Sequence, residues 1–217
     1  MANKVRYGLR NTKYAVYNPA TASYGEVKEL KGAVSLSLSL EGGDSSDFYA
    51  DDGIYHTFAG TNGGYSGDLE LARITDEVRV DLLGEAVDDT TGVQYEKTTA
   101  EPAEFAIITE MQGDSGPIGF AFYNCKANRP EIQANTKGES PDVDTDTLSL
   151  RIAAREFVIN EVTTPVVQGH IEKTADNTAK FAAFFAAVTY PGTIAGSDDA
   201  ESAESDDAES GESTLSA

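Results

Sequence analysis

Few residues in this sequence combine the types and the spacing that enzyme chemistry needs. Gly113-Asp114-Ser115-Gly116-Pro117 carries a hydroxyl between two glycines, and His56 precedes it, in the order of a histidine base and a serine nucleophile. Serine hydrolases with that order have a further glycine in the loop, different neighbours around the histidine, and disulfides that one cysteine cannot form. The composition of the motif is also typical of a tight turn, which is the interpretation favoured here.

The acidic residues that could bind a cation do not form a complete metal-binding motif. Asp142-x-Asp144-x-Asp146 has the opening spacing of a calcium loop, but the sixth position is not glycine and the twelfth is Ala153 instead of glutamate. The pairs Asp51-Asp52 and Asp88-Asp89 are shorter still. Solvated acidic turns explain them, so we expect no metal and no other cofactor.

The remaining reactive side chains are isolated in the sequence. His56 and His170 are far apart and have no evident partner, so each is interpreted as a surface or loop histidine. Cys125 lies in a predicted strand over 117–127, on the face with the small residues, where a buried inert thiol is expected. These patterns predict a protein that is not an enzyme.

Charge divides the 217 residues into two parts. There are 37 acidic and 16 basic side chains, for a net charge of −21. Residues 192–217 hold eight of the acids, no base and no aromatic residue, a composition typical of a disordered tail. The body, 1–191, still carries 29 acids and a charge of −13. Such a surface disfavours phosphate binding, and no apolar run reaches the roughly 18 residues of a membrane span.

The elements that position these residues follow a period of two. Leucines and serines alternate over 33–40, and similar alternation recurs over 68–71, 118–123 and 148–152. The pattern predicts a largely antiparallel sheet, with Val34, Leu36, Leu38, Leu69 and Leu71 facing the core. The stretches 104–112 and 117–127 flank the glycine-containing turn and should form a hairpin.

Two segments have the signals of helices and one has those of a long loop. Thr75 can cap a helix that contains Val78, Leu82 and Leu83 and ends at Gly84. Asp176 can cap a second helix, before Pro191, whose apolar face would pack on the sheet; that face comprises Phe181, Phe184, Phe185 and Val188. Residues 41–67 are rich in glycine and aromatics, which predicts a long loop or an extended hairpin.

A series of phrases in the body is similar to the major tail protein, or tail tube protein, of long-tailed non-contractile bacteriophages, especially those of Gram-positive hosts. The similarity spans about residues 3–191, and the order and spacing of the phrases carry it. The phrases are Lys4-Val5-Arg6-Tyr7-Gly8-Leu9, Tyr14-Ala15-Val16, Gly32-Ala33-Val34-Ser35-Leu36-Ser37-Leu38, Phe48-Tyr49-Ala50-Asp51-Asp52-Gly53, Gly64-Tyr65-Ser66-Gly67-Asp68-Leu69-Glu70, Leu82-Leu83-Gly84, Phe122-Tyr123-Asn124-Cys125-Lys126-Ala127, Thr147-Leu148-Ser149-Leu150, Phe184-Phe185 and Tyr190-Pro191.

The resemblance implies an antiparallel β-sandwich or partial barrel with one or two flanking helices. It also implies a virion protein, made in the host cytoplasm, whose copies close into six-membered rings that stack into a hollow tail tube. The implied partners are further copies of the chain, a tape-measure protein inside the tube, and tail terminator and baseplate or distal tail proteins at its ends. Double-stranded DNA would pass through without specific binding, and no membrane is involved.

This interpretation gives two groups of residues a predicted place. The lumen of the tube should be lined by Ser35, Ser37, Ser39, Asp68 and Glu70, although an ordinary outer solvated face explains the same alternation. Contacts with a neighbouring subunit are expected from the aromatic side chains of the 41–67 loop, which are Phe48, Tyr49, Tyr55, Phe58 and Tyr65.

Three alternatives to the tube subunit are open at this point. A tail terminator, baseplate ring or secretion-tube component could share the same fold. A carbohydrate-binding β-sandwich could use the loop aromatics as its platform. The third alternative is a hydrolase acting through Ser115.

Overall fold

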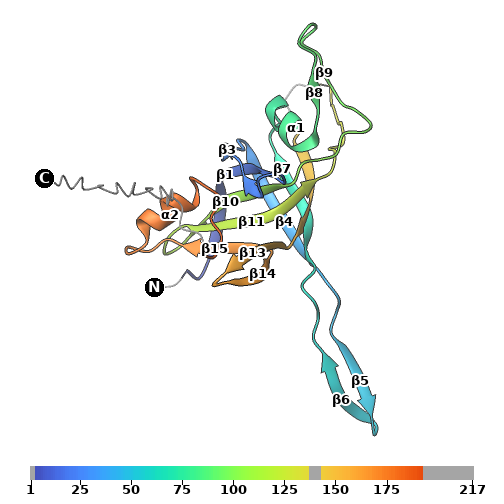
Figure 1. Ribbon diagram of the computed structural model, residues 1–217, viewed down its shortest axis with the longest axis vertical. Helices are drawn as coiled ribbons and strands as arrows, with labels where there is room; N and C mark the ends of the chain where they lie inside the picture. Colours follow the sequence, from blue (N-terminus) through green and yellow to red (C-terminus); the bar gives the residue numbers. More distant parts are fainter. Residues whose placement is uncertain (1–2, 137–142, 193–217) are drawn as a thin grey trace, which may run out of the picture.

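The structure is a computed structural model that describes residues 3–136 and 143–192 (Figure 1). Every strand pair in it is antiparallel. The fold is therefore mainly β with two short helices, as the sequence predicts. The elements are β1 (Arg6–Asn18), β2 (Ser23–Tyr24), β3 (Lys28–Glu29), β4 (Ala33–Glu41), β5 (Ser46–Ala50), β6 (Gly53–Phe58), β7 (Gly64–Leu71), α1 (Asp76–Leu83), β8 (Ala86–Val87), β9 (Gln94–Tyr95), β10 (Phe105–Gly113), β11 (Ile118–Ala127), β12 (Asp146–Ala153), β13 (Arg155–Ile159), β14 (Val162–Val166), β15 (Gln168–Glu172) and α2 (Thr178–Phe184).

One large sheet organises the molecule. Its order is β2-β1-β10-β11-β12-β7-β4, with β3 beside β1 and β15 beside β11. The predicted hairpin is present as β10 and β11, which pair from Met111 and Ile118 at the turn to Phe105 and Cys125 at the far end. Three further pairs, β5–β6, β8–β9 and β13–β14, form small sheets of their own.

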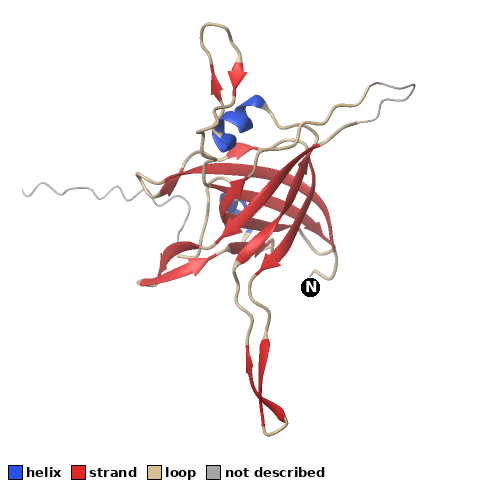
Figure 2. Ribbon diagram, turned by 90° about the vertical axis from the view of Figure 1, so that its right-hand side faces the viewer, coloured by secondary structure: helices blue, strands red, loops and turns tan. Residues whose placement is uncertain are grey.

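The large sheet is curved and has a separate apolar core against each side of its central strands (Figure 2). The first core lies inside the curve, where Leu69 of β7 meets Ile107 of β10 beneath the side chains of α1. The second core lies on the other side of β1, β10 and β11, against α2 and β13. Residues 105–108 of β10 and most of β11 are buried on both faces, so these stretches are apolar at nearly every position.

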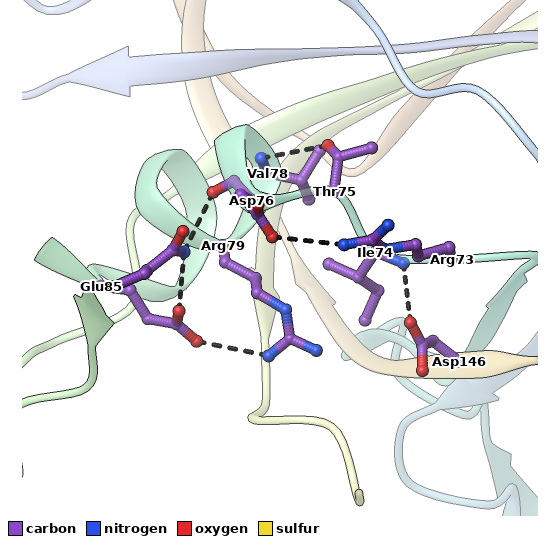
Figure 3. Close-up of polar contacts among 9 residues, drawn as sticks. Arg73, Ile74, Thr75, Asp76, Val78, Arg79, Glu85 and Asp146 are labelled. Carbon is purple, nitrogen blue, oxygen red and sulfur yellow. Dashed lines mark hydrogen bonds and ion pairs between the residues drawn. The ribbon is translucent and has the colours of Figure 1, made fainter. Parts of the chain in front are cut away.

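Helix α1 begins and ends where the sequence predicts. The Thr75 hydroxyl accepts a hydrogen bond from the backbone N–H of Val78 at 3.5 Å, and Gly84 ends the helix with a φ of 73° (Figure 3). The backbone N–H of Ile74 donates to Asp146 Oδ2 at 2.7 Å, which ties the start of the helix to β12. Val78, Leu82 and Leu83 are buried, and they close one end of the first core.

Helix α2 begins one residue later than predicted. Its N-terminal flanking residue is Asn177 and not Asp176. The Asn177 side chain instead bridges the preceding turn, because its Oδ1 accepts from the N–H of Thr174 and its Nδ2 donates to the carbonyl of Glu172. The predicted apolar face is confirmed, since the four residues named for it all pack in the second core: Phe181, Phe184, Phe185 and Val188.

Two predictions about which face a side chain occupies are wrong, and irregular pairing explains both. Val34 was expected in the core but is 52% exposed, because the register between β4 and β7 shifts between Ala33 and Ser35. Cys125 is buried but lies in the first core, with Phe122, because a bulge between these two residues moves it off the small-residue face.

The stability of the fold should depend on the inward residues of β7. Leu69 is fully buried in the first core, so Leu69→Ala should lower the free energy of unfolding by about 2–5 kcal/mol. Ser37 is exposed on the adjacent strand, and Ser37→Ala should change it by no more than about 0.5 kcal/mol. Urea unfolding of both variants checks this, and equal effects would contradict the assignment of the two faces.

Candidate assembly surfaces

Strands β4, β7 and β12 lie side by side and turn one row of polar side chains outward. Ser35 pairs with Glu70 and Ser37 with Asp68, and on the other side of β7 Ser149 pairs with the same aspartate. All five residues predicted for a lumen share this surface. The polar face, as it is called below, comprises Ser35, Ser37, Ser39, Ser66, Asp68, Glu70, Thr147, Ser149 and Arg151.

Hydroxyl groups donate hydrogen bonds to both carboxylates of the polar face. The hydroxyls of Thr145 and Ser35 donate to the two oxygens of Glu70 at 2.7 and 2.9 Å. These bonds, with that of Thr145 the stronger influence, lower the pKa of the Glu70 carboxyl. Ser149 donates likewise to Asp68 Oδ1 at 2.7 Å. Arg151 is the one basic side chain among the nine residues of the face, so the face is acidic on balance.

The predicted extended hairpin is a projecting arm built from β5 and β6 (Figures 1 and 2). Asp51 and Asp52 form its two-residue turn, with φ values of 51° and 60°, the geometry of a tight hairpin turn. The arm joins the body through a narrow neck in which two chain segments approach closely. A Cβ on Gly42 would lie 1.8 Å from the carbonyl oxygen of Thr61, so only glycine fits at this crossing.

Four of the five aromatics predicted to contact a neighbour lie on the arm and are exposed. Phe48, Tyr49, Tyr55 and Phe58 have 54–74% of their surface accessible. Tyr65 differs, because it lies at the base of the arm, half-buried against the first core, with its ring edge-on to Phe122. Three of these rings form edge-on pairs within the arm, Phe48 with Tyr55 and Phe58 with His56.

The groups considered for hydrolysis are not brought together. Ser115 lies in the β10–β11 turn, where its N–H donates to Asn3 Oδ1 at 2.6 Å. His56 lies on β6, in the arm, which extends away from that turn (Figure 1). The motif therefore serves as a turn that fixes the start of β1. His170 is an exposed residue of β15, and its ring stacks on Phe120.

The thiol of Cys125 lies in the protein interior. Burial raises the pKa of Cys125, which has no surface exposure. Within residues 3–136 and 143–192, no group of three or more His, Cys, Asp or Glu side chains is arranged for a metal. Asp142 lies outside the described residues. No helix among the described residues is long and apolar enough to cross a membrane.

Sequence reasoning missed part of the polar face. Ser149 and Arg151 belong to it, and their alternation with Leu148, Leu150 and Ile152 is the signal that could have placed them. What alternation does not reveal is that β12 pairs with β7, a strand about 80 residues earlier.

No model of a known protein family matches the chain, and no curated protein matches it significantly.

The hydrogen bonds to Glu70 predict a defined pH dependence. The ordinary pKa of a glutamate carboxyl is 4.5, and that of Glu70 is lower in the folded protein. The ionised carboxylate therefore stabilises the fold fully when the pH is above 4.5, and this stabilisation is lost as the pH falls through the lowered pKa. Glu70→Gln should therefore be less stable than the wild type at pH 7, and the difference should shrink below pH 4.5. Denaturant unfolding across this range measures it. Ser35→Ala, which removes one donor, should show the same trend more weakly, and a constant difference at every pH would refute the explanation.

Proposed function

We propose that this protein is a structural tube subunit: the major tail protein of a long-tailed non-contractile phage, assembling as six-membered rings that stack into a hollow, DNA-conducting tail. The observation that carries the proposal is the combination, in one chain, of an acidic polar sheet face and a projecting aromatic arm. The sequence resemblance described above supports the same assignment.

An open sheet edge favours joining one subunit to the next within a ring. Strand β4 spans nine residues and, among the described strands, forms hydrogen-bonded pairs with β7 alone. Unpaired backbone groups on a long edge are a template for another chain. Pairing around a ring would remove the edges and form one large barrel from the sheets of all copies.

The polar face suits the wall of a DNA channel. It borders the open edge of β4, so a barrel closed through that edge would carry the face as a continuous lining. Asp68 and Glu70 would repel phosphates, and hydroxyls offer no fixed positive charge to hold them. The repulsion acts over a Debye length of roughly 8 Å at physiological salt, so it keeps DNA from adhering without blocking its passage.

The arm suits a contact between subunits. An isolated two-stranded hairpin is marginally stable in water, and the exposed side chains include Phe48, Tyr49, Tyr55 and Phe58. Burial of such rings against another copy would stabilise both the arm and the assembly. A contact between the arm and a different patch on the next copy would be head-to-tail, and contacts of this kind generate rings or filaments.

The chain leaves the described region beside β13, which is not part of the polar face. Gly192, the last described residue, lies near the backbone of β13, at Val158 and Ile159. Strand β13 packs with α2 on the second core, which covers β1, β10 and β11, whereas the polar face lies on β4, β7 and β12. The predicted acidic tail lies outside the described residues from position 193 onward, and we expect it on the outer surface of a tube.

Electron microscopy of the purified protein over a concentration series, with its solution mass, tests the proposed function. Hollow tubes or six-fold rings are the expected result. A strictly monomeric protein at every concentration would count against it, and specific glycan binding by that monomer would favour the carbohydrate-binding alternative suggested by the exposed arm aromatics.

Removal of arm aromatics should separate assembly from folding. The double variant Phe48→Ser/Tyr55→Ser lacks two exposed rings of the arm that lie edge-on to each other. Its melting temperature should stay close to that of the wild type, while tubes disappear. Tubes that form at the wild-type concentration would show that the arm is not an assembly contact.

A further inference from the structure

Charge is segregated along the chain more sharply than its total suggests. The first 25 residues contain Lys4, Arg6, Arg10 and Lys13 and no acid, whereas residues 41–72 contain seven acids and neither lysine nor arginine. In a protein with a net charge of −21, copies repel one another at long range. A basic region on one copy is where an acidic region of another can approach favourably.

The basic region is exposed and held in a fixed position. Residues 4–10, called the basic segment below, include Val5 and Tyr7 with 58% and 56% of their surface accessible. Asn3 anchors the start of the segment, since its Nδ2 donates to the carbonyl of Gly116 at 3.0 Å. Among the described residues, Lys4 and Arg6 take part in no ion pair, whereas Arg10 pairs with Glu110. The Asp114 carboxylate lies beside the segment, because its Oδ1 accepts from the backbone N–H of Lys4 at 2.8 Å. The segment is therefore held in place, and the side chains of Lys4 and Arg6 take no part in the ion pairs of the described residues.

A pocket adjoins the basic segment and adds aromatic surface. Its volume is about 540 Å³, and its lining includes Arg6, Phe120 and His170. Glu172 also lines it, and the Oε1 atom of that residue accepts from the backbone N–H of Asn3 at 3.1 Å. The Arg6 guanidinium lies 5.7 Å from the centre of the Phe120 ring, and the His170 ring stacks on the same ring at 5.8 Å. Strand β15, which carries His170, pairs with β11 and has no second neighbour among the described strands.

The arm has the complementary chemistry. Its four exposed aromatics share the hairpin with Asp47, Asp51 and Asp52. Figures 1 and 2 show that it extends away from its own body, so it can reach a basic segment only on a second copy. Acidic and aromatic groups on the arm match cationic and aromatic groups at the pocket.

We propose that the arm of one copy docks on the basic segment and the Arg6–Phe120–His170 pocket of another copy. This deepens the proposed function, on which it rests, by naming the surface that receives the arm. Asp51 and Asp52 lie against Lys4 and Arg6, and arm aromatics pack beside Phe120. Opposite charges guide the approach, and burial of the rings holds the contact.

Site-directed disulfide cross-linking between two singly substituted proteins tests the docking directly. Cys125 is fully buried, so an introduced cysteine is the one accessible thiol among the described residues. Asp51→Cys mixed with Lys4→Cys should give an intermolecular disulfide on mild oxidation. The matched control is Lys97→Cys, an exposed lysine beyond β9, at the opposite end of the molecule from the arm (Figure 1). Cross-linking to position 97 in place of position 4 would overturn the docking surface.

A charge exchange gives an independent readout. Arg6→Glu should raise the concentration needed for assembly by about tenfold, because it places like charges together. Addition of Asp51→Arg in the same chain should restore assembly. Failure of the second change to restore it would contradict the pairing of these two positions.

The outcomes also separate this contact from the proposed function. Tubes that form without a disulfide between positions 51 and 4 would refute the docking and leave the tube subunit intact. That disulfide in small oligomers, with no tubes at any concentration, would support the docking and contradict the tube. The absence of both tubes and disulfide would overturn both.

Discussion

Burial of the central strands on both faces is the constraint on which the rest of the structure depends. Strands β10 and β11, together with residues 14–16 of β1, contribute apolar side chains to both sides of the sheet, so each side must be covered. The sheet curls to place β12 and β7 over one side together with α1, while α2 and β13 cover the other. Once the curl exists, the outward side of β4, β7 and β12 has nothing left to pack against and is polar.

The acidic composition acquires a physical meaning from this arrangement. Carboxylates are not distributed evenly: some lie on the polar face and others on the arm, while the start of β1 is basic. A channel that repels DNA needs an excess of acidic side chains, whereas an attractive contact between copies needs basic side chains on one of the two surfaces. The separation of acidic and basic residues along the chain provides both. The same feature explains how a strongly acidic protein could assemble with itself.

Local signals in the sequence were enough to predict the elements that depend on local chemistry. The caps at Thr75 and Gly84 located α1, and the composition of the 113–117 turn located the β10–β11 hairpin. The side chains of Val34 and Cys125 were placed wrongly because bulges change the face that a residue occupies, and a bulge depends on the partner strand. Tyr65 was assigned to the loop because its packing against Phe122 depends on tertiary structure.

The residues of the candidate surfaces also differ in whether the sequence alone could predict them. Ser35, Ser37, Asp68 and Glu70 could be grouped from alternation, because β4 and β7 are the two sides of one long hairpin. Ser149 and Arg151 could not, because their strand joins the face through long-range pairing. Sequence alternation also cannot say whether a polar face meets bulk solvent or a channel, since both environments favour the same side chains.

Thiol labelling of assembled Ser37→Cys tests most directly whether the polar face lines a channel. Position 37 is exposed in the middle of the face, and Cys125 is buried and does not react. In intact polymers a small maleimide should label position 37, while a maleimide attached to a folded protein should be excluded except at the ends; dissociated subunits should react with both. Equal labelling by both reagents in intact polymers would place the polar face on the outside and contradict the account.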